Sequence, residues 1–237
     1  MLLHGVGLRA EAWGAQIDDL SEDCAVEAFD MPGHGAAARL EGSVDLATYT
    51  DRLADTLDAG VVVVGHSMGA MIALDLAVRY PGLVHGVVAM NAIYQRAPEA
   101  ALAVKRRAAQ LDGTLAADPR GAIARWFGDS ETPEARACRT WLQLVDPGAY
   151  RDAYTVFAHE DGPDPSDLRQ MQMPALFLTG ADDPNSTPAM SRAMARAAPD
   201  ARAEIVEGAA HMLPMTHAAA VNDILRAFIR TCPSIGA

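Results

Sequence analysis

A run of four valines followed by a glycine-serine motif constrains the fold of this chain more than any other feature. Val61 to Val64 are β-branched and apolar, which predicts a short buried strand. The motif Gly-His-Ser-Met-Gly follows at 65–69, and apolar residues at helical spacing continue over 70–78. In this order of strand, tight turn and helix, G-x-S-x-G is typical of a nucleophile elbow, in which a strained turn projects the hydroxyl of Ser67 above the sheet. Taken alone, the motif is also compatible with an ordinary serine-containing turn.

Strand and helix patterns alternate on both sides of this motif. Such alternation predicts an α/β fold with a mostly parallel sheet and helices on both faces. We expect strands at 1–3, 24–29, 61–64, 84–90, 174–179 and 203–206, and helices at 12–20, 46–57, 70–78, 188–198 and 221–230.

The stretch between residues 98 and 166 has a different character. Strand patterns are absent there, and helical segments at 99–110, 119–127, 133–145 and 148–158 alternate with Pro and Gly breaks. We interpret it as an inserted helical lobe, so that 1–95 and 167–237 form the core and 96–166 form the insertion. We expect most aromatic residues of this lobe to pack its own small core and a minority to line a substrate cavity. These residues are Trp126, Phe127, Trp141, Tyr150, Tyr154 and Phe157.

Composition excludes several classes of partner and site. The 237 residues carry a formal net charge of −12, whereas nucleic acids and anionic membranes require a basic surface. Three cysteines at wide spacing form neither a disulfide framework nor a zinc pattern, which suits a reducing cytoplasm. The chain shows no signal-peptide pattern at its start, and no apolar stretch reaches the ~20 residues that cross a bilayer. We therefore expect a cytoplasmic protein.

Three residues of the types that act together in nucleophilic catalysis follow predicted strands. Ser67 ends the valine strand, Asp183 follows the strand that closes at Thr179, and His211 follows the strand at 203–206. A serine hydroxyl becomes a good nucleophile when a base accepts its proton, and imidazole titrates near neutrality. A carboxylate then fixes the imidazole tautomer and stabilises the imidazolium. Since ligands bind at the carboxyl ends of parallel strands, the three residues together predict a catalytic site.

The chain resembles the α/β-hydrolase superfamily with a helical cap, of the small bacterial esterase, enol-lactonase and meta-cleavage-product hydrolase type. The order Ser, Asp, His along the chain agrees with that superfamily. The resemblance implies the α/β-hydrolase fold with an inserted helical cap. It selects Asp183 as the acid, three residues after a glycine, with the adjacent Asp182 as the alternative. The family usually has a strand hairpin before its His-Gly strand, and the printed sequence does not include it. The matching motifs are Leu3-His4-Gly5-Val6-Gly7, Asp30-Met31-Pro32-Gly33-His34-Gly35, Gly65-His66-Ser67-Met68-Gly69, Gly180-Ala181-Asp182-Asp183 and Gly208-Ala209-Ala210-His211.

Acyl transfer also needs an oxyanion hole with two hydrogen-bond donors. The first is the backbone N–H of Met68, which follows the nucleophile. The resemblance implies that the second is the N–H of Val6. We expect His4 and His34 to hold loops and His66 to pack under the elbow, with substrate contact as the alternative for His66. We assign these histidines to no metal site, and the predicted mechanism uses no cofactor.

The sequence therefore predicts a serine hydrolase that cleaves a small carboxylic ester or lactone through an acyl-enzyme. Three alternatives remain: a carbon–carbon bond hydrolase of the meta-cleavage type, a perhydrolase or acyltransferase, and a non-catalytic small-molecule receptor. We expect neither nucleic acid nor membrane as a partner, and the oligomeric state is open, with a homodimer as one option. If the substrate is anionic, cap arginines would bind its carboxylate, and the candidates are Arg106, Arg107, Arg125 and Arg139.

Overall fold

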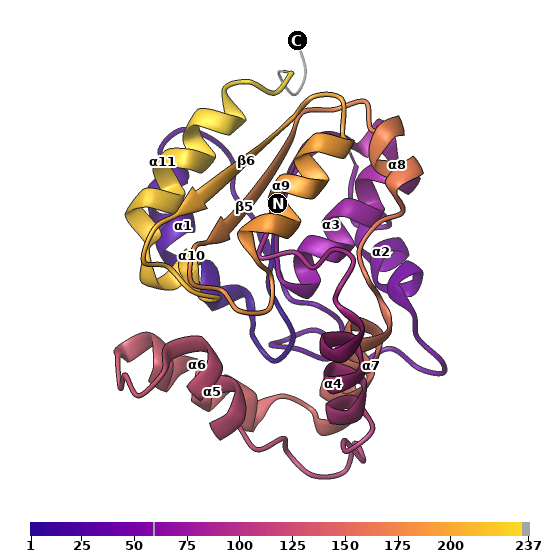
Figure 1. Cartoon of the computed structure of the whole chain (residues 1–237), viewed down its shortest axis with the longest axis vertical. Coiled ribbons are helices and arrows are strands. Elements are labelled where there is room, and N and C mark those ends of the chain that lie inside the picture. Colours follow the sequence, from indigo (N-terminus) through magenta and orange to yellow (C-terminus); the bar gives the residue numbers. More distant parts are fainter. Residues whose placement is uncertain (59, 234–237) are drawn as a thin grey trace.

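A six-stranded sheet lies at the centre of the computed structural model, which describes residues 1–58 and 60–233 (Figure 1). Its strand order is β2-β1-β3-β4-β5-β6, and every neighbouring pair is parallel, which confirms the predicted sheet. The strand expected at 24–29 is reduced to two residues, because it pairs only with the two-residue β1. The strands are β1 (Leu2–Leu3), β2 (Ala28–Phe29), β3 (Val61–His66), β4 (Val84–Met90), β5 (Ala175–Gly180) and β6 (Ala201–Val206).

Helices cover both faces of the sheet (Figure 1). One face carries the 3-10 helix η1 (Ala10–Trp13), α1 (Gly14–Leu20), α10 (Leu213–Thr216) and α11 (Ala218–Ile229). The other carries α2 (Leu46–Ala54), α3 (Met68–Arg79), α8 (Pro165–Gln170) and α9 (Pro188–Ala197). The 3-10 helix η2 (Pro81–Leu83) leads into β4. The short helices α8 and α10 were not expected from the sequence.

Alternating strand residues divide the apolar core between these two faces. Val63, Val87 and Phe177 point toward α2, α3 and α9. Their neighbours Val64, Val88 and Leu176 point toward α1 and α11. Successive side chains of a strand point to opposite faces, so a strand covered on both sides reads as a continuous apolar run. The strand predicted from the four valines is therefore confirmed, with Val63 and Val64 buried and Val61 and Val62 half-buried at its start.

Four helices between β4 and α8 lie beyond one end of the sheet, in the lower part of Figure 1. They agree with the helical segments expected for the insertion to within one or two residues at most ends. The division at residues 96 and 166 stays a prediction, and we use the word cap for these helices. The cap helices are α4 (Pro98–Ala108), α5 (Arg120–Phe127), α6 (Pro133–Leu144) and α7 (Pro147–His159).

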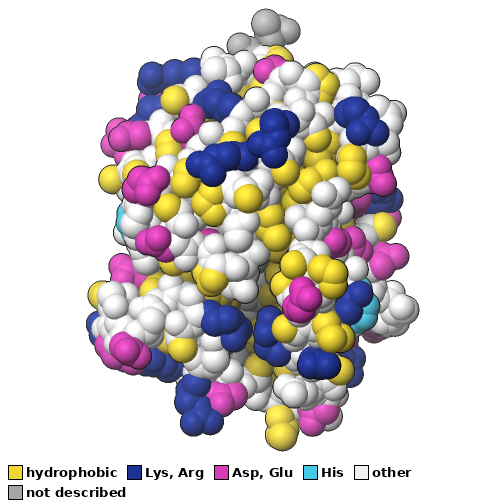
Figure 2. Space-filling view, viewed as in Figure 1, with side chains coloured by type: hydrophobic (Ala, Val, Ile, Leu, Met, Phe, Trp, Pro, Cys, Tyr) yellow, Lys and Arg dark blue, Asp and Glu magenta, His cyan; other side chains and the backbone are white. Residues whose placement is uncertain are grey.

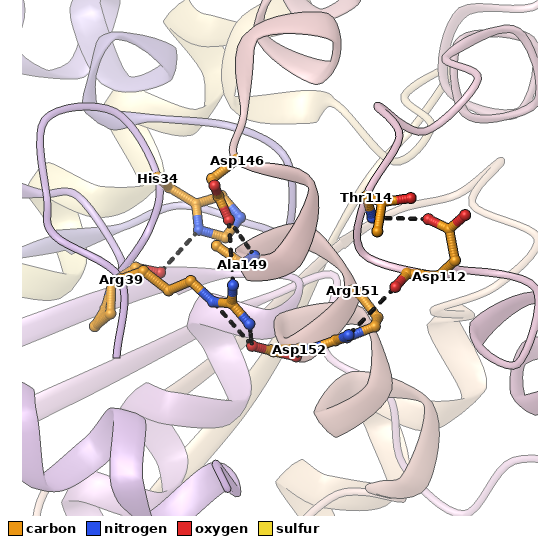
Figure 3. Close-up of polar contacts among 9 residues, drawn as sticks. His34, Arg39, Asp112, Thr114, Asp146, Ala149, Arg151 and Asp152 are labelled. Atoms are coloured by element: carbon orange, nitrogen blue, oxygen red, sulfur yellow. Dashed lines mark hydrogen bonds and ion pairs between the residues drawn. The ribbon is translucent and has the colours of Figure 1, made fainter. Parts of the chain in front are cut away.

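A network of arginines and aspartates ties α7 to a core loop (Figure 3). Arg39, in the loop between β2 and α2, donates to Oδ2 of Asp152 at 2.6 Å. Arg151 donates to the other oxygen of Asp152 at 2.7 Å and to the carbonyl of Asp112, between α4 and α5, at 3.3 Å. Arg151 and Asp152 together therefore join α7 to two segments that are distant in the sequence.

None of the helices in the described residues combines the length and the apolar composition needed to cross a membrane.

Candidate active site

Ser67 lies in a strained turn between β3 and α3. Its backbone φ is 56° and its ψ is −116°, in the region that favours glycine. Its N–H donates to the carbonyl of Met90 at 2.9 Å, which fixes the turn to the neighbouring strand. Held in this way, a serine at the end of a strand presents its side chain to the carboxyl edge of the sheet.

The two glycines of the motif permit this close packing. A Cβ added to Gly65 would lie 2.1 Å from the carbonyl oxygen of Gly69, and one added to Gly69 would lie 2.3 Å from the carbonyl oxygen of Leu3. Both contacts are with backbone atoms, which a side chain cannot displace. The Gly-x-Ser-x-Gly spacing is therefore required by the approach of α3 to β1 and β3.

Asp183 and His211 are joined by a hydrogen bond of 2.7 Å, from Nδ1 of the imidazole to Oδ2 of the carboxylate. Asp183 lies in the loop after β5 and His211 in the loop after β6, and both side chains are buried. The neighbouring Asp182 is exposed. Of the two candidate acids, Asp183 is thus the one that the structure places against the imidazole.

Asp183 accepts three further hydrogen bonds. The N–H groups of Asn185 and Ser186 donate to Oδ1 at 2.8 and 3.1 Å, and the amide of Asn91 donates to Oδ2 at 2.7 Å. Burial alone would raise the pKa of Asp183. The charge and hydrogen bond of His211, with the two backbone donors, outweigh burial and lower this pKa to about 2. The carboxylate is therefore ionised at neutral pH.

Ser67 and His211 line the same cavity, whose volume is about 240 Å³. Within the described residues, Ser67 Oγ makes no hydrogen bond to the imidazole. Catalytic hydrogen bonds in structures without substrate are often long and tighten when substrate binds. The cavity is large enough for a small molecule and lies between the carboxyl edge of the sheet and the cap.

The two oxyanion-hole donors expected from the sequence are the N–H groups of Val6 and Met68. Met68 is the first residue of α3, where backbone donors have no acceptor in the helix. Val6 lines the cavity, and a Cβ on the preceding Gly5 would lie 3.1 Å from Cβ of Ser67. Neither N–H donates to another group in the part of the chain that the structure describes. The assignment of these two N–H groups to an oxyanion hole stays a prediction.

Comparison with known proteins identifies the family. The model of the alpha/beta hydrolase family matches residues 1–224. The chain belongs to the alpha/beta hydrolase family.

Relatives of this alpha/beta hydrolase include enzymes with named substrates. The (E)-2-((N-methylformamido)methylene)succinate hydrolase of Acinetobacter baylyi is 38% identical, over 98% of this chain and 90% of that protein. A malate-bound structure of a thermophilic esterase from Thermogutta terrifontis has a TM-score of 0.85 and 26% identity, over 97% of this chain and 88% of that one. The structure of the enol-lactonase from Burkholderia xenovorans LB400 shows the shared fold. It has a TM-score of 0.81 and 24% identity, over 97% of this chain and 90% of that one.

Cap aromatics line the cavity of this alpha/beta hydrolase more often than the sequence predicted. A minority was expected there, yet four of the six line the cavity, and these four also pack in the apolar clusters of the cap, as expected. The ring of Trp126 stacks on His211 with 6.0 Å between centroids and 21° between planes. Helical periodicity did not distinguish a side chain facing the cap core from one facing Ser67, because both surfaces are apolar. The four residues are Trp126, Tyr150, Tyr154 and Phe157.

Two of the four candidate arginines, Arg107 and Arg125, line the cavity. Arg139 pairs with Glu131 at 2.6 Å, and Arg106 is exposed outside the cavity. Sequence reasoning missed Arg96, which follows β4 and also lines the cavity. The sequence analysis also did not single out Asn91. Its position directly after β4, at the same edge of the sheet as Ser67, could have indicated it.

Three buried histidines support the loops around the site. His4 accepts from the N–H of Met31 at 3.0 Å, and its Nδ1 donates to the carbonyl of Gly5 at 2.8 Å. Nε2 of His66 donates to the carbonyl of His211 at 2.8 Å, and its ring also borders the cavity. His34 donates to the carbonyl of Pro32 at 3.2 Å. Burial lowers the pKa of His4 and His66 to about 3 and that of His34 to about 4.

The described residues contain no group of three or more His, Cys, Asp or Glu side chains arranged to hold a metal ion.

Proposed function

We propose that this alpha/beta hydrolase is a serine hydrolase that cleaves a small carboxylic ester or lactone through an acyl-enzyme. The observation that carries the proposal is the 2.7 Å hydrogen bond between Asp183 and His211, beside a strained serine in the same cavity. The serine supplies the nucleophile, the imidazole the base and the carboxylate the orienting charge. The proposed partner is a small-molecule substrate, because the cavity is only about 240 Å³.

The proposed reaction has two halves. His211 takes the proton of Ser67 as Oγ attacks the carbonyl carbon, and the N–H groups of Val6 and Met68 stabilise the oxyanion. The tetrahedral intermediate collapses, and His211 returns the proton to the leaving alcohol. Water then attacks the acyl-enzyme by the same route and releases the acid. Each step uses a group of the chain itself, so the proposal includes no cofactor.

Covalent labelling tests the proposal directly. We expect a fluorophosphonate to add one phosphonyl group to the protein, at Ser67, and to abolish hydrolysis of short 4-nitrophenyl esters. The Ser67→Ala protein should be unlabelled and lose at least about 10³-fold in kcat. Labelling at another residue, or full activity of Ser67→Ala, would contradict the proposal. Labelling without turnover of any acyl substrate would favour a small-molecule receptor.

The Acinetobacter relative favours a second candidate reaction. The named substrate of that relative contains an N-methylformamido group. In the second candidate reaction, this chain therefore cleaves an acyl–nitrogen bond of its substrate. The same residues would serve, with His211 protonating a leaving nitrogen in place of a leaving oxygen. A panel of a short ester, a lactone, an N-formyl enamide and a vinylogous dioxo acid would distinguish oxygen, nitrogen and carbon leaving groups by kcat/KM.

A further inference from the structure

Three arginines and no carboxylate line the candidate catalytic cavity. Arg96, Arg107 and Arg125 contribute to its walls, and none of the lining residues is Asp or Glu. This distribution is opposite to that of the whole chain, whose formal net charge is −12. Figure 2 shows Lys and Arg side chains beside the hollow between the upper core and the lower cap. The cavity is therefore a local cationic site in an acidic protein.

Two of the arginines, Arg96 and Arg107, lie against one face of α7. Tyr150, Tyr154 and Phe157 are spaced at i, i+4 and i+7, so they share that face. Nε of Arg107 donates to the hydroxyl of Tyr154 at 3.1 Å, and the guanidinium of Arg96 lies 4.7 Å from the ring centre of Phe157. Burial lowers the pKa of Arg96, and the nearby Asp161 and Tyr154 oppose this shift.

The arginines differ in how many of their hydrogen-bond donors and charges are paired within the protein. Arg96 donates to the carbonyls of Glu160 and Phe157, and its side chain is 6% exposed. Its guanidinium also lies 3.9 Å from Asp161. Arg107 and Arg125 have no carboxylate within ion-pair distance in the described part of the chain. Arg107 and Arg125 therefore line the cavity with guanidinium donors that no carboxylate of the described residues occupies.

We propose that the substrate carries a free carboxylate, which lies between Arg107 and Arg125 while its acyl carbonyl lies at Ser67. This inference rests on the proposed function and assigns the substrate class as half-esters, or corresponding mono-amides, of small dicarboxylic acids. Guanidinium groups bind carboxylates through paired, charge-assisted hydrogen bonds. A bound carboxylate would also balance the positive charge of these two arginines, which no carboxylate of the described residues pairs with.

Direct binding tests the anion site without using catalysis. In the Ser67→Ala protein, isothermal titration calorimetry would compare glutarate with its neutral diamide. We expect glutarate to bind more than about tenfold more tightly than the diamide, and its affinity to fall as salt is raised. Arg107→Gln and Arg125→Gln should each weaken glutarate binding about tenfold or more. Arg106→Gln is the matched control, because Arg106 neighbours Arg107 on α4 but is exposed outside the cavity.

Kinetics of the active protein provide a second test. We expect a higher kcat/KM for monoethyl glutarate than for diethyl glutarate. Arg107→Gln should lower this ratio about tenfold or more, mainly through KM of the monoester. Arg107→Lys should retain part of the preference, since it keeps the charge and loses the planar pair of donors. Circular dichroism of each variant would confirm that it is folded.

The outcomes separate the two proposals. If glutarate does not bind Ser67→Ala, or if Arg106→Gln weakens binding as much as Arg107→Gln, the anion site is wrong even when esters are hydrolysed. If glutarate binds as expected but no acyl compound is cleaved, the anion site stands and the proposed function fails. A diester that is cleaved better than the monoester would also overturn the inference.

Discussion

The side-chain amide of Asn91 donates a hydrogen bond of 2.7 Å to Oδ2 of Asp183. The same oxygen accepts from Nδ1 of His211. Asn91 is fully buried at the end of β4, has a φ of 49° and also donates to the hydroxyl of Thr179 at 3.3 Å. A strained residue in this position helps to orient the carboxylate and stabilises its negative charge by hydrogen bonding.

Replacing Asn91 should therefore change the pH dependence of catalysis. In Asn91→Ala, Asp183 loses a donor and its carboxylate attracts the proton of the imidazolium more strongly. We expect the acid limb of the kcat/KM profile to move to higher pH in this variant, with about a tenfold loss of kcat/KM at neutral pH. In Asn91→Asp, two carboxyl groups in contact cannot both ionise, so the new side chain stays protonated and the acid limb should move less than in Asn91→Ala.

A purely structural role of Asn91 would lower the thermal stability and the amount of active protein, but it would leave the position of the acid limb unchanged. Titration of Ser67 with a fluorophosphonate gives the concentration of competent sites and separates these outcomes.

The two adjacent aspartates provide a matched pair of variants. Asp183→Asn should lower kcat by about 10³- to 10⁴-fold, because the neutral amide no longer stabilises the imidazolium or fixes its tautomer. Asp182→Asn should change kcat by less than about threefold, because this side chain is exposed and makes no contact with His211. Comparable losses in the two variants would contradict the assignment of the acid. Steady-state kinetics on one ester substrate suffice.

Two glycine-to-alanine substitutions should have opposite effects on stability. Gly65→Ala should lower the free energy of unfolding by about 3 kcal/mol or more, since its Cβ would lie 2.1 Å from a backbone oxygen of α3. Gly14→Ala should raise it by about 0.5 kcal/mol, because Gly14 has helical angles and open space around its Cβ position. Urea denaturation followed by circular dichroism measures both, and equal effects would show that the elbow is loosely packed.

The buried histidines should make the protein sensitive to mild acid. The pKa of His66 in the folded protein is about 3, against an ordinary value of 6.5. Below pH 6.5 the unfolded chain takes up a proton at His66 that the folded protein does not, so stability falls as the pH falls toward 3. The slope is up to about 1.4 kcal/mol per pH unit for each such histidine. His66→Gln should reduce the measured slope between pH 6 and 4 by about this amount, and an unchanged slope would contradict the prediction.

Local features of the sequence were enough to predict the sheet and the elbow. Four consecutive valines read correctly as a strand covered on both faces, and the glycines around Ser67 as a close approach of helix to strand. The helical segments of the cap were predicted for the same reason, because spacing and Pro breaks are properties of neighbouring residues. The two unexpected helices, α8 and α10, have six and four residues, too short for periodicity to indicate.

The composition of the site was decided by contacts between distant residues. Asn91 and Asp183 are 92 positions apart, and their hydrogen bond depends on the register of β4 against β5. Four arginines were equivalent candidates in the sequence, and only the packing of α4 and α5 over the sheet turned Arg107 and Arg125 toward the cavity. The sequence determined which residue types lie at the strand ends, because strands and turns depend on residues that are adjacent in the chain. Tertiary structure decided which of those side chains meet, because loops that are distant in the chain are brought together only when the parallel sheet forms.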